Sequence, residues 1–137
     1  MSDSDQQDDY VLNLPIRDDH VLWRRIPANK WIFDENLGRT RPSSNAFNDH
    51  RDGSHMSVYD SENCGGIEAV MAGHDGFFLC SFTAAIARKL GFELMRTSSG
   101  GRGHCEVAGK KTKALQTQMA KTAEWVIAPV SSVDHRD

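Results

Sequence analysis

Long hydrophobic runs, closely spaced cysteine pairs and an excess of positive charge are all missing from this chain of 137 residues. The longest apolar runs, such as 77–80, fall far short of the roughly 20 residues that a membrane-spanning helix needs. The formal net charge of -3 argues against a broad nucleic-acid-binding face, which usually carries a basic excess. Any site for an anion must therefore be local.

Cysteine is scarce as well. Cys64, Cys80 and Cys105 are an odd number and include no Cys-x-x-Cys pair. Thiolates and imidazoles are the ligands that zinc prefers, and His74 and His104 add two imidazoles, but the spacing supports no metal site. The N-terminus also opens with acidic and polar residues, not with a basic and then apolar leader. We therefore expect a cytoplasmic protein with free thiols, no bound metal and no cofactor.

The composition that remains is typical of one folded domain. Hydrophobic residues make up 39% of the chain and charged residues 26%, which is near the globular average. The segment 1–9 contains several aspartates and no positive charge, so we expect a disordered acidic tail there. The polar end at 131–137 is expected to be frayed. A single domain over 10–130 is long enough to bury its own core.

Local patterns predict a small α+β domain with a mixed or antiparallel sheet and two main helices. A helix of about 82–90 is predicted from Ser81 as N-cap and Gly91 as stop signal, and a second of about 113–127 from Thr112 as cap. One or two further helical turns are expected within 65–73. The predicted strands are 21–26, 31–33, 56–59, 92–97 and 104–108.

Each predicted main helix carries a single apolar stripe, which indicates packing into one common core. We expect that core to contain Phe82, Ile86, Leu90, Leu115, Met119 and Val126. On the strand 104–108, alternation places Cys105 and Val107 inside, and His104 and Glu106 outside or facing a cleft. Such an exposed polar pair is compatible with acid-base work, although it more often has no role.

The densest polar segment is 38–47. Arg39 and Arg41 present planar guanidinium groups that match phosphate or carboxylate, and Ser43 and Ser44 can complete the shell of a bound oxyanion. The alternative is structural: a turn at Pro42 whose arginines pair with nearby carboxylates. The long segment 34–54 could instead contact a partner protein.

A second candidate for anion binding is the glycine-rich loop 98–103, with Arg102 as counter-charge, although such loops more often only join two strands. Downstream, Gly109-Lys110-Lys111-Thr112 suggests a phosphate-binding P-loop. That motif needs glycine, four residues and then Gly-Lys-Ser/Thr, and the spacing here does not meet it.

One pattern in the chain combines the run Arg41-Pro42-Ser43-Ser44-Asn45-Ala46-Phe47 with 56–58, 87–91 and 104–109, before a helix that ends at Trp125-Val126. This pattern resembles small uncharacterised bacterial proteins. That resemblance covers most of the predicted domain and implies no activity.

The chain is also similar to RES-type NAD-degrading toxins, which have ADP-ribosyl-transferase-like folds. This likeness implies an early strand arginine, a tyrosine or serine, and a glutamate as functional residues. Here those roles would fall to Arg24 or Arg25, to Tyr59, and to Glu62 or Glu68, and Gly38-Arg39 meets part of the family's glycine-rich motif.

The function we expect is that of a binding or regulatory module. Its oxyanion site would comprise Arg39, Arg41, Ser43, Ser44 and Arg102. Its partner would be a phosphate-bearing small molecule or another protein. The alternative is an enzyme that cleaves NAD or transfers ADP-ribose, in which an arginine holds the pyrophosphate and a glutamate stabilises the positive charge on the ribosyl group.

Overall fold

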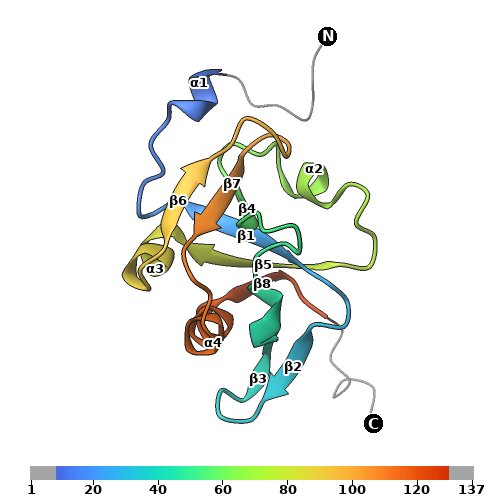
Figure 1. Cartoon of the computed structure of the whole chain (residues 1–137). Coiled ribbons are helices and arrows are strands. Elements are labelled where there is room, and N and C mark those ends of the chain that lie inside the picture. The colour runs from blue at the N-terminus through green and yellow to red at the C-terminus, as the bar shows by residue number, and fades with distance from the viewer. Residues whose placement is uncertain (1–8, 130–137) are drawn as a thin grey trace.

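The computed structural model describes residues 9–129, so the two predicted terminal segments lie almost wholly outside it. Figure 1 shows the arrangement of the elements. The helices are α1 (Asp9–Leu12), α2 (Ile67–Met71), α3 (Ala84–Lys89) and α4 (Lys113–Thr122), with a 3-10 turn at Ser44–Ala46. The strands are β1 (Val21–Ile26), β2 (Trp31–Asp34), β3 (Arg39–Pro42), β4 (Met56–Asp60), β5 (Phe78–Thr83), β6 (Glu93–Arg96), β7 (His104–Ala108) and β8 (Glu124–Ile127).

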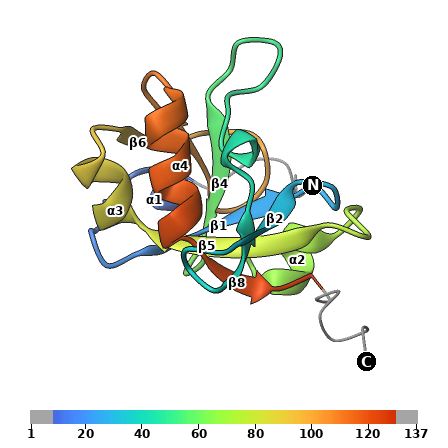
Figure 2. The same cartoon turned by 90° about the horizontal axis from the view of Figure 1, so that it is seen from below.

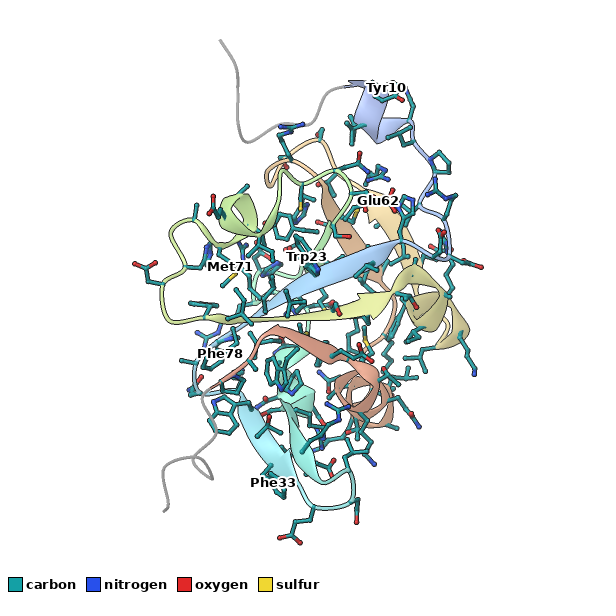
Figure 3. All side chains as sticks on the ribbon, turned by 180° about the vertical axis from the view of Figure 1, so that it is seen from behind. Tyr10, Trp23, Phe33, Glu62, Met71 and Phe78 are labelled. Atoms are coloured by element: carbon teal, nitrogen blue, oxygen red, sulfur yellow. The ribbon has the colours of Figure 1, made fainter. Side chains whose placement is uncertain are left out.

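Six strands form an antiparallel sheet in the order β6-β7-β4-β1-β5-β8. β2 and β3 form a separate two-stranded hairpin, at whose far end Phe33 lies in Figure 3. The predicted α+β class with an antiparallel sheet is thus confirmed. No helix within residues 9–129 is long and apolar enough to cross a membrane.

The two faces of the six-stranded sheet carry different apolar clusters. α3 and α4 contribute Ala84, Ala87 and Met119 to the larger cluster, and Figures 1 and 2 show where both helices lie. The smaller cluster lies on the other face and contains Val70 of α2, with Trp23 and Met71 packed against it. Figure 3 is drawn from behind and labels these last two residues. α2 covers only part of its face, and this leaves room for a site there.

The first predicted helix begins later than expected. α3 starts at Ala84 and its N-cap is Thr83, whose side chain accepts a hydrogen bond from the backbone N–H of Ile86. Ser81, the predicted cap, lies instead in β5 opposite Trp23 of β1. Pairing with β1 keeps this segment extended, which a local reading of the apolar spacing could not detect.

The second predicted helix is too long by five residues. α4 ends at Thr122, and the residues after it form β8, an edge strand that pairs with β5. Trp125, Val126 and Ile127 are aromatic or β-branched, and such residues favour strands. Val126 therefore packs against the smaller cluster, so the prediction that it shares a core with Met119 is wrong.

Four of the other predicted core residues lie in the larger cluster or against it. Phe82 and Met119 are buried in the larger cluster, and Leu90 and Leu115 pack against it while partly buried. Ile86 is half-buried. Cys105 and Val107 are fully buried, as the alternation of β7 predicts.

A buried polar network joins the start of β1 to the edge of the sheet. The carboxylate of Asp60 is fully buried and accepts hydrogen bonds from Arg96 at 2.8 Å, His20 at 3.0 Å and Asn63 at 3.0 Å. Burial alone would raise the pKa of Asp60, but these donors and the backbone N–H of Glu62 outweigh it and lower the pKa. The network therefore holds an ionised carboxylate inside the protein.

Candidate functional site

Polar side chains gather on the face of the sheet that α2 leaves partly open. Successive strand residues point to opposite faces, so Arg25 shares a face with Trp23, Ser57 with Tyr59, and His104 with Glu106. The register places Ser57 opposite Glu106 and Tyr59 opposite His104. Three strands that are distant in sequence thus bring their polar residues together.

Three adjoining hollows, which we call the histidine cleft, lie over these residues. The first, of about 490 Å³, is lined by residues that include His50, Ser57, His104 and Glu106. The second, of about 230 Å³, shares His50 and Ser57 with the first. The third, of about 640 Å³, shares Arg25, Tyr59 and His74 with the second. Because neighbouring hollows share residues, one extended ligand could occupy more than one of them.

Arg25 is held in the cleft by contacts to α2, to β4 and to His74. It donates from Nη1 to the carbonyl of Val70 at 2.7 Å and from Nη2 to the hydroxyl of Tyr59 at 3.0 Å. Its guanidinium carbon also lies 4.9 Å from the centroid of the Tyr59 ring. The Tyr59 hydroxyl in turn donates to the carbonyl of Gly100. These contacts fix the guanidinium group and use only some of its five N–H donors.

Ser57 lies between two imidazole rings. Its Oγ is 2.8 Å from Nε2 of His50 and 2.9 Å from Nε2 of His104. The other ring nitrogen of His104 contacts the hydroxyl of Thr97, which donates to the carbonyl of Ser99 at 2.6 Å. A serine hydroxyl within hydrogen-bond reach of an imidazole meets one requirement for an activated serine.

His104 is neutral at physiological pH. Burial is the main cause, and it lowers the pKa of His104 to about 4 with help from the positive charge of Arg25 and from His50. His104 is only 7% exposed, and its ring packs edge-on against Tyr59 with centroids 5.4 Å apart. A neutral imidazole keeps one nitrogen able to accept a proton.

The glycine-rich loop 98–103 owes its glycines to close packing under the cleft. A Cβ atom on Gly100 would lie 2.6 Å from the ring of His104, and one on Gly103 would lie 2.8 Å from the backbone of Cys64. Both residues also have positive φ, a conformation that other residues rarely adopt. The loop places Arg102 at the third hollow, beside Gly100 and Gly101.

The other four predicted anion ligands lie elsewhere, and the side chains of Arg39, Arg41 and Ser44 already have protein partners. Arg41 is buried, pairs with Asp34 at 2.7 Å and lowers the pKa of that carboxylate. Arg39 donates to the carbonyl of Lys121, and the hydroxyl of Ser44 contacts Thr117, both on α4. Ser43 precedes the 3-10 turn, and its side chain makes no capping hydrogen bond. These four residues line none of the three hollows, so the structure separates them from Arg102.

The residues suggested by the RES likeness are brought together only in part. Arg25 and Tyr59 are in contact, whereas Arg24 donates to the carbonyls of Ala46 and Ser57 and its burial lowers its pKa to about 10. Glu62 pairs with Arg17 and lies near His20. Figure 3 shows Glu62 apart from Met71. Glu68 is exposed on α2. The only glutamate that lines any of the three hollows is Glu106.

The thiols and possible metal ligands do not form a reactive centre in the described part of the chain. Cys64, Cys80 and Cys105 are buried free thiols, and burial raises the pKa of the last two to about 12. At neutral pH they are protonated and poor nucleophiles. Within residues 9–129, no group of three or more histidine, cysteine or acidic side chains is arranged to hold a metal ion.

Comparison of this chain with models of protein families, with curated proteins and with solved structures finds no match. The assignment of a function therefore depends on the geometry of the histidine cleft.

Proposed function

We propose that the protein is a binding module that accepts a phosphate-bearing small molecule in the histidine cleft. The supporting observation is the local charge. The three hollows are lined by four arginines and three histidines but only two acidic side chains, in a chain whose net charge is negative. The basic residues are Arg24, Arg25, Arg51, Arg102, His50, His74 and His104, and the acidic residues are Asp52 and Glu106.

Arg25 is the proposed main anion ligand. Its guanidinium group is partly exposed and oriented by Tyr59, so little side-chain entropy is lost when it binds an oxyanion. Arg102 lines the same hollow from the opposite loop and can neutralise a second phosphate. A cytoplasmic location is part of this proposal and is supported by the free thiols.

The sequence predicts an oxyanion site of Arg39, Arg41, Ser43, Ser44 and Arg102, and of these only Arg102 lines the histidine cleft that we propose as the site. The reason for this choice is the free-energy cost of freeing each arginine from its present partners. Arg41 is bound to a carboxylate inside the protein, and releasing it would leave Asp34 as an unpaired buried charge. Arg25 faces no such cost, because its partners are a carbonyl, a hydroxyl and a ring nitrogen of His74, and none of them is a carboxylate.

A melting experiment tests this proposal. Inorganic pyrophosphate at ten times its Kd should stabilise the protein by about 1.4 kcal/mol and raise the melting temperature by a few degrees. Arg25→Gln should remove that shift, and the matched variant Arg39→Gln should retain it. Each shift is measured against the same variant without ligand, so changes in basal stability cancel. A shift that survives Arg25→Gln but disappears in Arg39→Gln would return the site to the β2–β3 hairpin.

A second candidate function is cleavage of NAD. The contact of 3.0 Å between Arg25 and Tyr59 favours it, because that pair was expected to share a site. Glu106, which lines the adjoining hollow, would take the role expected of Glu62 or Glu68. Release of nicotinamide from NAD that is lost in Glu106→Gln and retained in Glu62→Gln would support it. Purified protein that releases no nicotinamide would exclude it.

A further inference from the structure

The hydrogen bonds around Ser57 can be given directions. Thr97 has a single hydroxyl hydrogen, and its contact of 2.6 Å with the carbonyl of Ser99 requires that hydrogen, because two bare oxygen atoms would repel each other. The Thr97 oxygen must then accept from Nδ1–H of His104. A neutral His104 consequently carries its lone pair on Nε2, the nitrogen that faces Ser57.

This assignment makes Ser57 the donor to His104. Its hydroxyl hydrogen points at Nε2 of His104 over 2.9 Å, and its oxygen accepts from Nε2–H of His50 over 2.8 Å. Ser57 is thus the nucleophile, His104 is the base, and Thr97 is the group that orients the base. These three roles are what an activated serine requires. Ser57 is partly exposed and lines two of the hollows, so a ligand can reach it.

We propose that Ser57 is a nucleophile, activated by His104, that cleaves esters of phosphate-bearing alcohols or acids. The choice of substrate class rests on the proposed function, since Arg25 lies in a hollow that also contains Ser57. The serine chemistry rests on the hydrogen bonds among Ser57, His104 and Thr97. The two parts can therefore fail separately.

The reaction would proceed in two balanced steps. Ser57 Oγ forms a bond to the carbonyl carbon of the ester, its proton passes to Nε2 of His104, and the carbon–oxygen bond to the alcohol breaks. The departing alkoxide takes the proton from His104, which leaves an acyl group on Ser57. Water then attacks the acyl carbon with the same base, so the acid leaves and Ser57 regains its hydrogen. No oxidant, metal or cofactor is needed.

The bound anion would also assist His104. The positive charge of Arg25 is one of the causes that lower the basicity of this imidazole. A phosphate group beside Arg25 would offset that charge and raise the basicity of His104 when the ester is in place. An ester without an anionic group would lack this assistance and should react more slowly.

Ser54 provides a matched control. It lines the first hollow together with Ser57, but its hydroxyl donates to the carboxylate of Asp52 at 2.7 Å and contacts no imidazole in the described part of the chain. The two serines share a hollow and differ in their partners. Any reagent that modifies hydroxyls only because they are accessible should treat them alike.

The test uses diisopropyl fluorophosphate on the full chain, followed by intact mass measurement and peptide mapping. Ser57 should form a bond to phosphorus as fluoride leaves, giving one adduct at this residue. Ser57→Ala should abolish the adduct, and Ser54→Ala should leave its rate within about twofold. His104→Asn should slow labelling by about 100-fold, whereas His50→Gln should slow it by less than tenfold because His50 only donates to Ser57.

Two results would overturn the inference. One is a wild-type protein that gains no adduct, or gains it at Tyr59 or another residue, and this result does not depend on how any variant folds. The other is loss of labelling in His50→Gln with full labelling in His104→Asn, which would reverse the assigned hydrogen bonds. If the wild-type protein gains no adduct but pyrophosphate still raises its melting temperature, the serine chemistry is rejected and the binding proposal stands.

Discussion

Acidification should destabilise this protein because His104 is buried without a charge. In the unfolded chain this imidazole titrates near 6.5, whereas in the folded protein burial lowers its pKa to about 4. Between these values the unfolded chain binds more protons than the folded one. Stability is therefore fully present above pH 6.5 and falls as the pH drops toward 4.

The size of this effect follows from the two pKa values. Each pKa unit corresponds to about 1.4 kcal/mol, and between pH 7 and pH 5 the proton binding of His104 should remove about 2 kcal/mol of unfolding free energy. The carboxylates whose pKa is lowered, such as Asp60, also lose stability in acid, but they titrate mostly below this window.

Urea unfolding of the wild type, His104→Gln and His50→Gln at pH 7 and pH 5 would measure the contribution. His104→Gln should lose about 2 kcal/mol less than the wild type on acidification, whatever its stability at pH 7. His50 is only a minor cause of the lowered pKa of His104, so His50→Gln should keep most of the acid-induced loss. Equal losses of unfolding free energy in the wild type and His104→Gln would refute the reasoning, because they would show that His104 has the same pKa in the folded and unfolded chain.

Two further predictions concern the fold. Met119→Ala should cost about 2–5 kcal/mol in urea unfolding because Met119 is fully buried, and Leu115→Ala should cost clearly less because Leu115 is only half-buried. Equal costs would mean that α4 packs differently. Asp60→Asn should cost about 3–5 kcal/mol, since it leaves Arg96 without its buried counter-charge. A change below 1 kcal/mol in the same assay would show that the network contributes little.

Local signals in the sequence were sufficient for most strands and for the existence of both main helices. The capping role of Thr112 and the alternation of β7 were predicted because they depend only on neighbouring residues. The segments 82–83 and 124–127 were misread as helix. Residues 82–83 are held as strand by pairing with β1, and 124–127 by pairing with residues 79–81 of β5, so the partners are distant in sequence.

The site was harder to predict than the fold. Alternation within each strand showed that His104 and Glu106 share a face, but no local pattern gives the register that places them beside Ser57 and Tyr59. His50 and His74 lie on loops, and their approach to the sheet depends on the whole fold. Conversely, the segment 38–47 carries the densest polar pattern because its side chains tie the hairpin and 3-10 turn to α4 and to Asp34.

The central claim is that an anion binds at Arg25 in the histidine cleft. The most direct measurement is a titration of the isotope-labelled protein with inorganic pyrophosphate, followed by NMR of backbone amides and imidazole rings. We predict saturable shifts at Arg25, Tyr59, His104 and the 98–103 loop, with little change at Arg39 and Arg41. Saturable shifts confined to the β2–β3 hairpin, or no saturable shifts at all, would contradict the account.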